Sequence, residues 1–295
     1  MKTTSLVASC LVAYAALCMP LVAAEPVAPA KPGLQTDVEF AQVGDVSLTL
    51  DAFVPAGDGP FPTCIFVHGG GFMRGDKQSY IKPLFEPIGA AGFTWFTINY
   101  RLAPGHRWPA CADDVATAVR WVRAHAKQYK VDPQRIALIG ESAGGHLVSW
   151  HGATMADKKT GESKAADDAS VAAVVPFYAP HDLELHVRRR NELGPSMTAL
   201  LGLTELNDEA WKTLRAASPI QKIHPGMPPY LLIHGDADVQ VAYEQSPLFQ
   251  EKMQAAGNVC DLIKIPAGVH GMGGWDKLKS DYREQLIAWL RKTLK

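Results

Sequence analysis

The hydrophobic residues of the chain gather in short runs that are separated by longer amphipathic stretches. The runs lie at residues 63–67, 93–98, 136–139, 171–176, 230–233 and 261–265. Short apolar runs of this kind are typical of parallel strands that are buried on both faces of a sheet. We therefore predict a buried strand at each run.

The stretches between these runs show helical periodicity. In residues 113–129, Val115, Ala118 and Val122 recur at the spacing of one helix face, and charged residues occupy the other side. Further helices are predicted at 143–155, 243–256 and 279–294. Strands that alternate with helices predict an α/β fold with a mostly parallel central sheet and helices on both faces.

One segment precedes this alternation of strands and helices, and two later segments interrupt it. Residues 38–54 alternate polar and apolar side chains around Gly44-Asp45, which predicts an antiparallel hairpin at a sheet edge. Residues 157–170 are small and polar and predict a surface loop. Residues 182–217 form a longer insertion with a helix-like stretch through Trp211.

The insertion at 182–217 carries three consecutive arginines, Arg188, Arg189 and Arg190. A run of like charges usually forms a solvated face, and we take this as the first interpretation. The alternative is that the insertion caps a pocket, because it precedes the last two predicted strands.

The first 24 residues have the pattern of a secretory signal peptide. Lys2 supplies the positive charge, residues 6–22 are mostly apolar, and Val22-Ala23-Ala24 provides a small-residue cleavage site before Glu25-Pro26. The alternative is a retained membrane helix, for which this stretch has only marginal length. We predict cleavage after about Ala24 and a secreted or periplasmic protein, with no stable membrane insertion afterwards.

Charge and cysteine content narrow the class of protein. The chain has 29 Lys and Arg against 30 Asp and Glu among its 295 residues, a net charge of −1. This balance argues against a dedicated nucleic-acid binder, which needs a basic surplus. Three cysteines lie beyond the predicted signal, Cys64, Cys111 and Cys260; they can form at most one disulfide, and buried free thiols are an equal expectation.

Residues 140–144 read G-E-S-A-G and stand between a predicted strand and a predicted helix. A G-x-S-x-G sequence in this context is a nucleophile elbow, in which a tight turn exposes the serine hydroxyl at the carboxyl edge of the sheet. Glycines at 140 and 144 would let strand and helix approach each other closely. Ser142 is therefore the candidate nucleophile.

Residues 68–71 read H-G-G-G and follow another predicted strand. Glycines allow backbone N–H groups to point into a cavity, as an oxyanion hole requires. The alternatives are a phosphate-binding loop and a plain structural turn. Arg74 stands where G-x-G-x-x-G needs its last glycine, so this dinucleotide motif is absent.

The last two predicted strands are each followed by a candidate partner for Ser142. Residues 234–238 read H-G-D-A-D, and His270 lies in the loop after the final strand. A serine needs a histidine base, and the histidine needs a carboxylate that fixes its tautomer. Asp238 is placed far enough past the strand end to turn toward His270, whereas Asp236 is expected to bond the backbone of its own turn.

These motifs together resemble those of α/β-hydrolase-fold carboxylesterases. The segments that carry the resemblance are 68–71 (H-G-G-G), 99–104 (N-Y-R-L-A-P), 108–110 (W-P-A), 140–146 (G-E-S-A-G-G-H) and 234–238 (H-G-D-A-D). The chain is similar to both the acetylxylan-esterase-like (BD-FAE type) and the hormone-sensitive-lipase-like esterases. Residues 228–235 and 268–273 fit the acetylxylan/feruloyl branch better, whereas Gly105 and Glu141 depart from the usual pattern of the relatives.

The resemblance implies a role for each site residue. Ser142 would be the nucleophile, His270 the base and Asp238 the acid that orients it. The backbone N–H groups of Gly70, Gly71 and Ala143 would form the oxyanion hole. The H-G-x-x-D spacing of the family also selects Asp238 over Asp236.

The sequence thus predicts a serine carboxylesterase that hydrolyses short-chain acyl esters, with acetyl or feruloyl esters of carbohydrates as an analogy-based suggestion. It predicts a signal peptide at 1–24, a flexible leader at 25–36 and a catalytic domain at 37–295, and implies no metal or organic cofactor. Trp108 and Trp275 would either stack on sugar rings or pack in the core. The alternatives are a serine peptidase of the prolyl-oligopeptidase type and a non-catalytic binding protein on a hydrolase fold.

Overall fold

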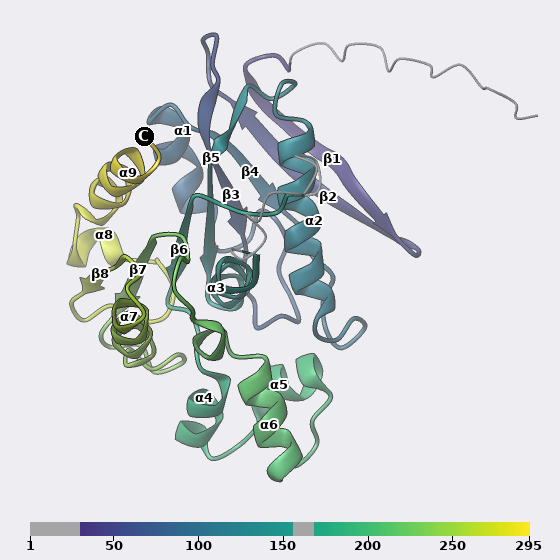
Figure 1. Ribbon diagram of the computed structural model, residues 1–295, viewed down its shortest axis with the longest axis vertical. Coiled ribbons are helices and arrows are strands. Elements are labelled where there is room, and N and C mark those ends of the chain that lie inside the picture. The colour runs from purple at the N-terminus through teal and green to yellow at the C-terminus, as the bar shows by residue number, and fades with distance from the viewer. Residues whose placement is uncertain (1–29, 156–167) are drawn as a thin grey trace, which may run out of the picture.

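A computed structural model describes residues 30–155 and 168–295 (Figure 1). The predicted signal peptide, the first part of the predicted leader and most of the predicted loop 157–170 lie outside the described residues. Within the described parts, no helix is both long enough and apolar enough to cross a bilayer.

A single eight-stranded sheet forms the centre of the described chain. Its strands are β1 (Gly33–Val43), β2 (Val46–Val54), β3 (Phe61–Val67), β4 (Thr94–Ile98), β5 (Val131–Glu141), β6 (Ala173–Phe177), β7 (Tyr230–Gly235) and β8 (Cys260–Ile265). Their order in space is β1-β2-β4-β3-β5-β6-β7-β8. The pairs β1–β2 and β2–β4 are antiparallel and all other neighbours are parallel, which confirms the predicted α/β class and the edge hairpin.

One strand prediction needs a correction. The final run, 261–265, was expected to be buried on both faces, but in β8 Asp261 and Lys264 are exposed while Cys260 and Ile265 are buried. The reason is position: β8 is the last strand in the sheet, and only one of its edges is paired. An edge strand tolerates charged residues, which also discourage pairing with another chain.

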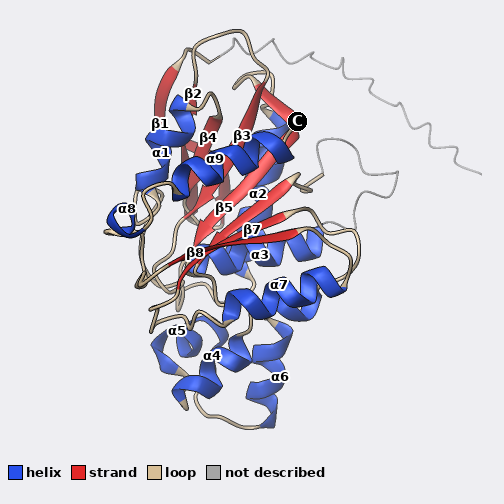
Figure 2. Ribbon diagram, turned by 90° about the vertical axis from the view of Figure 1, so that its left-hand side faces the viewer, coloured by secondary structure: helices blue, strands red, loops and turns tan. Residues whose placement is uncertain are grey.

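The helices lie in layers on the two faces of the sheet (Figure 2). Their bounds are α1 (Phe85–Ala90), α2 (Ala110–Ala124), α3 (Ala143–Met155), α4 (Leu183–Arg190), α5 (Gly194–Leu201), α6 (Asp208–Ala216), α7 (Gln245–Ala255), α8 (Trp275–Leu278) and α9 (Tyr282–Thr293), with short 3-10 turns at Lys82–Leu84 and Pro219–Lys222. The core divides accordingly. Ile65 and Val67 of β3 pack with α2 and α3, and the alternate residues Cys64 and Phe66 pack with α1 and α9.

Helix α2 begins and ends earlier than the sequence pattern predicts. It runs from Ala110 to Ala124 rather than over 113–129, because the chain leaves the helix at His125 and turns back into β5. Lys130 adopts the left-handed conformation at φ +53°, and the N–H of Val131 donates to the carbonyl of Ala126. The apolar Ala126 continued the helical pattern, but it packs against the core from this turn.

The insertion at 182–217 is largely helical and forms a lobe beyond the carboxyl ends of the strands, drawn in green in Figure 1. Asp182 caps α4 by accepting a hydrogen bond from the N–H of Leu185, and Asn207 caps α6 in the same way toward Ala210. The predicted helix-like stretch through Trp211 is therefore corrected to three separate helices, with Trp211 inside the last.

The three arginines of the insertion are exposed, as predicted, but they are not merely solvated. The guanidinium of Arg188 pairs with Glu184 at 2.7 Å and lies 4.1 Å from the centre of the Trp211 ring. Arg189 pairs with Glu244 at the start of α7. The contacts of Arg188 lie within the insertion, and that of Arg189 joins the insertion to the start of α7.

All three described cysteines, Cys64, Cys111 and Cys260, are buried and free. Of the two expectations for them, the buried free thiol is confirmed. Burial raises the pKa of the Cys111 thiol to about 12, so it stays protonated at neutral pH.

A buried ion pair fixes the start of α2. Asp114 is 1% exposed, and its carboxylate accepts hydrogen bonds from the backbone N–H of Arg101 at 2.8 Å and from the Arg101 guanidinium at 2.7 Å. This contact joins α2 to the loop that follows β4.

We expect Asp114→Asn to lower the free energy of unfolding by about 2–4 kcal/mol, because it leaves a partly buried guanidinium without its counter-ion. Urea unfolding measures the effect. Asp113→Asn is the matched control: Asp113 is exposed one residue away, and the change should stay within about 0.5 kcal/mol. Equal stability of the two variants would show that the buried pair contributes nothing.

Candidate active site

Ser142 lies at a strained turn between β5 and α3. Its φ is +52°, a left-handed conformation that is uncommon for a residue with a side chain. A Cβ added to Gly140 would lie 2.3 Å from the carbonyl oxygen of Gly144, and one added to Gly144 would lie 2.1 Å from that of Val67. Only glycine fits at either position, so the predicted close approach of strand and helix is confirmed.

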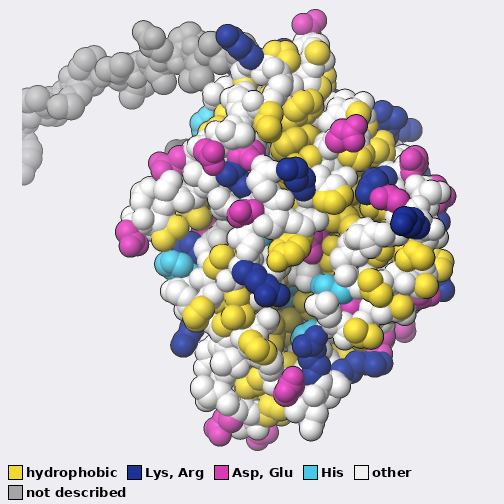
Figure 3. Space-filling view, turned by 180° about the vertical axis from the view of Figure 1, so that it is seen from behind, with side chains coloured by type: hydrophobic (Ala, Val, Ile, Leu, Met, Phe, Trp, Pro, Cys, Tyr) yellow, Lys and Arg dark blue, Asp and Glu magenta, His cyan; other side chains and the backbone are white. Residues whose placement is uncertain are grey.

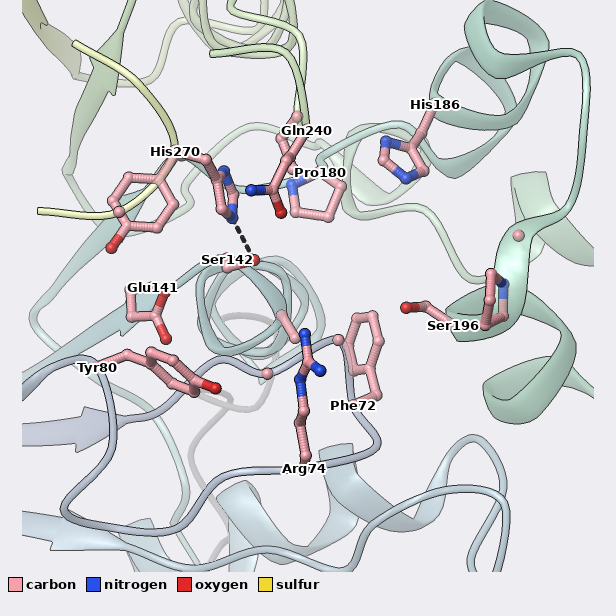
Figure 4. A pocket seen from close by; sticks show the side chains of 18 of the residues that line it. Phe72, Arg74, Tyr80, Glu141, Ser142, Pro180, His186, Ser196, Gln240 and His270 are labelled. Carbon is pink, nitrogen blue, oxygen red and sulfur yellow. Dashed lines mark hydrogen bonds between the residues drawn. The ribbon is translucent and has the colours of Figure 1, made fainter.

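The structure brings Ser142, His270 and Asp238 into one hydrogen-bonded chain, of which Figure 4 shows the contact between Ser142 and His270. The Oγ of Ser142 lies 2.9 Å from Nε2 of His270, and Nδ1 of His270 lies 2.6 Å from Oδ2 of Asp238. The three residues follow β5, β8 and β7, whose carboxyl ends meet at one edge of the sheet. An imidazole in this position can accept the serine proton while the carboxylate stabilises the imidazolium.

Asp238 is held by its own loop as well as by His270. Its other oxygen, Oδ1, accepts hydrogen bonds from the N–H groups of Gln240 at 2.8 Å and Val241 at 2.9 Å. Burial alone would raise the pKa of this carboxyl, but hydrogen bonds from His234 and His270 lower it well below its usual range. The group is therefore an anion at neutral pH.

His234 is a second contact of this carboxylate that the sequence reasoning missed. It is fully buried, with Nε2 at 3.3 Å from Oδ2 of Asp238 and Nδ1 at 2.8 Å from the hydroxyl of Ser246. The signal was present in the H-G-x-x-D spacing, where a histidine at the strand end stands four residues before the acid. Its ring contacts Oδ2, the same oxygen of Asp238 that His270 contacts.

Asp236 contacts a different segment from the one expected. Its Oδ1 accepts a hydrogen bond at 2.6 Å from the N–H of Ala267, and its Oδ2 lies 3.4 Å from the amine of Lys264. We predicted that this carboxylate would bond its own turn. It instead joins the turn after β7 to the loop that carries His270, because these neighbouring strands end side by side.

The glycine loop after β3 lies against Ser142. Gly70 and Gly71 have φ values of +101° and +63°, and a Cβ at Gly70 would lie 2.0 Å from the carbonyl oxygen of Arg74. Two contacts hold the preceding residue, Gly69: its N–H donates to the Glu141 carboxylate, and its carbonyl accepts from the hydroxyl of Tyr100 at 3.3 Å. The Gly69 carbonyl and the Gly70 N–H belong to one trans peptide and point in opposite directions, so the contact with Tyr100 also orients the N–H of Gly70.

Glu141 is a buried acid that the sequence reasoning noted only as a departure from a pattern. It is 3% exposed and its carboxylate contacts the backbone of Gly69. Burial raises its pKa to about 7, against the opposing effect of the Gly69 N–H. The residue before the nucleophile therefore links the elbow to the glycine loop.

A cavity of about 460 Å³ opens above Ser142. Gly70, Gly71 and Ala143 line it beside the serine, and His186 and Ser196 line it from the α4–α5 part of the insertion (Figure 4). Trp108 and Trp275 do not. Trp275 is fully buried and Trp108 packs edge-on against Trp150, so the packing interpretation of both is confirmed. The described residues contain no group of three metal-ligating side chains.

Comparisons with known proteins agree with this geometry. The sequence model of the family designated BD-FAE matches residues 50–253. Esterase LipC of Mycobacterium tuberculosis (strain ATCC 25618 / H37Rv) is 33% identical over 231 residues, covering 78% of this chain and 57% of LipC. The chain spans about half the length of the curated relatives it matches.

Two solved structures show the same fold. A truncated carbohydrate esterase from gut microbiota is 25% identical, with a TM-score of 0.76 over 90% of this chain and 99% of that one. The propionate-bound esterase Est2 of Thermogutta terrifontis is 28% identical, with a TM-score of 0.68 over 88% and 93% of the two chains. The predicted resemblance to α/β-hydrolase esterases is confirmed.

The raised pKa of Glu141 makes a prediction about stability. A carboxyl whose pKa is higher in the folded than in the unfolded chain stabilises the fold below the unfolded value, near 4.3, and loses this contribution as the pH rises through about 7. Glu141→Gln keeps an acceptor for Gly69 but removes the titration. The unfolding free energy of the variant relative to the parent should therefore rise, on the order of 3 kcal/mol, between pH 4.5 and 8.

Urea unfolding at a series of pH values measures this difference. Glu251→Gln is the control, because Glu251 is exposed on α7 and should give a flat difference. If the unfolding free energy of Glu141→Gln relative to the parent were also independent of pH, the pKa of Glu141 would not be raised in the folded chain.

Proposed function

The chain belongs to the BD-FAE family, and on this premise we propose that it is a serine carboxylesterase. The observation that carries the proposal is the continuous hydrogen-bonded chain from Ser142 through His270 to Asp238, at a strained turn that faces a cavity. A merely structural serine would not require the left-handed backbone or the two glycines packed around it.

The reaction follows from this geometry. The Oγ of Ser142 attacks the ester carbonyl carbon while Nε2 of His270 takes its proton, and Asp238 stabilises the imidazolium. The developing oxyanion is bound by the N–H groups of Gly70, Gly71 and Ala143. The alcohol leaves with the proton from His270, and water, deprotonated by the same imidazole, then releases the acid and regenerates the serine.

The proposed substrates are short-chain acyl esters, with acetyl or feruloyl esters of carbohydrates as the natural candidates. Two of the similar structures support this choice: one is a carbohydrate esterase and another is an esterase with propionate bound.

We also propose that the protein is exported and processed after about Ala24, to act in the periplasm or outside the cell. The support is the pattern of residues 1–24 alone. The N-terminal sequence of the protein recovered from its producing cells tests this, and an intact residue 1 would overturn it.

Two aspartates near the site give a matched test of the proposed roles. Asp238→Asn should lower kcat for p-nitrophenyl acetate by about 10⁴-fold, because an amide favours the wrong imidazole tautomer; this magnitude is the one measured for the serine-protease triad. Asp236→Asn should lower it far less, since Asp236 contacts Ala267 and Lys264 and not His270. A larger loss for Asp236→Asn would exclude Asp238 as the orienting acid.

The lining of the cavity predicts the preferred acyl length. The kcat/KM for p-nitrophenyl esters should be highest between acetyl and butyryl and fall for longer chains, because the insertion contributes the polar side chains of His186, Arg190 and Ser196 to the cavity wall. A series of acyl lengths measured below the critical micelle concentration checks this. A maximum at ten carbons or more would contradict it.

A further inference from the structure

The cavity lining contains an arginine that hydrolysis of a simple acyl ester does not require. Among the described residues that line the cavity, Arg74 and Arg190 are basic and Glu141 is the only acid. Figure 4 shows Arg74 directed toward Ser142, with Tyr80 and Glu141 on the same side of the cavity. Resting on the proposed function, we propose that the site also takes short esters whose acyl group carries a carboxylate, bound by Arg74 and the hydroxyl of Tyr80, in preference to neutral acyl groups of the same size.

Arg74 has no ion-pair partner within the described residues. Asp76, two positions along, uses its carboxylate to accept hydrogen bonds from the N–H of Gln78 at 2.9 Å and the hydroxyl of Ser79 at 2.8 Å. Arg190 differs, because its guanidinium donates to the carbonyl of Gln240 at 2.6 Å. A guanidinium that is directed into a cavity without a counter-ion is suited to a carboxylate, which it binds through two parallel hydrogen bonds.

The loop of residues 72–80, here called the arginine loop, is anchored to the sheet. Lys77 is 9% exposed, and its amine lies 2.6 Å from Asp37 and 3.4 Å from the buried Asp51. Its backbone N–H donates to the side chain of Asn99 at 2.8 Å, and its carbonyl accepts from the hydroxyl of Thr97 at 2.5 Å. The loop that carries Arg74 and Tyr80 is therefore already ordered before a substrate binds, and binding does not cost the free energy of ordering it.

Tyr80 carries backbone strain that its packing does not explain. Its φ is +60°, unusual for a bulky residue, although 53% of its side chain is exposed. Glycine would occupy this conformation without strain. The strained backbone conformation places the Tyr80 side chain at the cavity. The phenol hydroxyl can donate a hydrogen bond to the same anion that Arg74 binds.

The position of the leaving group indicates which part of the ester Arg74 and Tyr80 contact. The leaving oxygen must lie near Nε2 of His270, from which it takes its proton. Arg74 and Tyr80 lie across Ser142 from His270 in Figure 4. The part of the ester that reaches them is therefore the acyl group, and a half-ester of a short dicarboxylic acid is the simplest molecule with the required chemistry.

The test compares two esters of equal size. Monoethyl succinate carries the carboxylate, ethyl succinamate replaces it with a neutral amide, and released ethanol is measured for both. We expect the kcat/KM of the anion to exceed that of the amide at least about fivefold at low ionic strength, and the ratio to fall as salt screens the charge. Each rate is normalised to hydroxide-catalysed hydrolysis of the same ester.

Substitutions then identify the residues that cause the difference in kcat/KM between the two esters. Arg74→Gln should reduce the ratio to near one, mainly through a higher KM for the anion, since binding of a remote carboxylate is uniform along the reaction. Arg74→Lys should retain part of the ratio. Arg291→Gln, on α9 and outside the cavity, is the control and should retain all of it. Tyr80→Gly should lower the ratio without lowering the melting temperature, because it also relieves strain.

A ratio at or below one in the parent enzyme, with ethyl succinamate or p-nitrophenyl acetate still hydrolysed, would overturn this proposal and leave the esterase function standing. An unchanged ratio in Arg74→Gln would do the same. If neither these esters nor p-nitrophenyl acetate were hydrolysed, the proposed function would fall, and this inference with it.

Discussion

The site depends on one steric constraint, the left-handed turn at Ser142. A chain that leaves β5 and enters α3 within one residue must bring backbone within about van der Waals contact of backbone, and Gly140 and Gly144 are the positions where this happens. The N–H of Ser142 donates to the carbonyl of Phe177 on β6 at 3.0 Å, so the turn is also tied to the neighbouring strand. This turn directs the serine side chain outward at the carboxyl edge of the sheet. Seen from behind, histidine side chains lie at a hollow near the middle of the molecule (Figure 3).

The other parts of the site are arranged around this turn by three carboxylates, of which Glu141 and Asp238 are buried. Glu141 joins it to the glycine loop through Gly69, Asp238 joins the β7 turn to His270, and Asp236 joins that same turn to Ala267. Each acid thus connects two loops that follow different strands. Because parallel neighbouring strands end together, such short side chains can span loops that are far apart in sequence.

The sequence predicted the elements and the chemistry well where the signal is local. The runs at 136–139 and 230–233, the hairpin around Gly44-Asp45 and the elbow at Ser142 are set by local hydrophobicity and by glycine, and all lie where expected. Predictions that depended on how separate elements pack together were less accurate. The exposure of β8 follows from its place at the edge of the sheet, and Ala126 continued a helical pattern although the chain had already turned.

The same distinction holds at the site. Ser142, Asp238 and His270 could be predicted from the sequence because each follows a predicted strand. The roles of Glu141 and Tyr100 could not be predicted, because each depends on a contact with the glycine loop, which belongs to another part of the chain. Asp236 shows the limit most clearly, since its partner Ala267 is adjacent only through the pairing of β7 with β8.

The central claim is that Ser142 is the nucleophile, and covalent labelling tests it most directly. Phosphonofluoridates react with a serine only where a neighbouring base activates it. After treatment of the parent enzyme, peptide mass spectrometry should find one phosphonyl group, on Ser142, with hydrolysis of p-nitrophenyl acetate lost in the same proportion as the label is gained. Ser142→Ala should take up no label. Label on another residue, or activity that survives complete labelling of Ser142, would contradict the account.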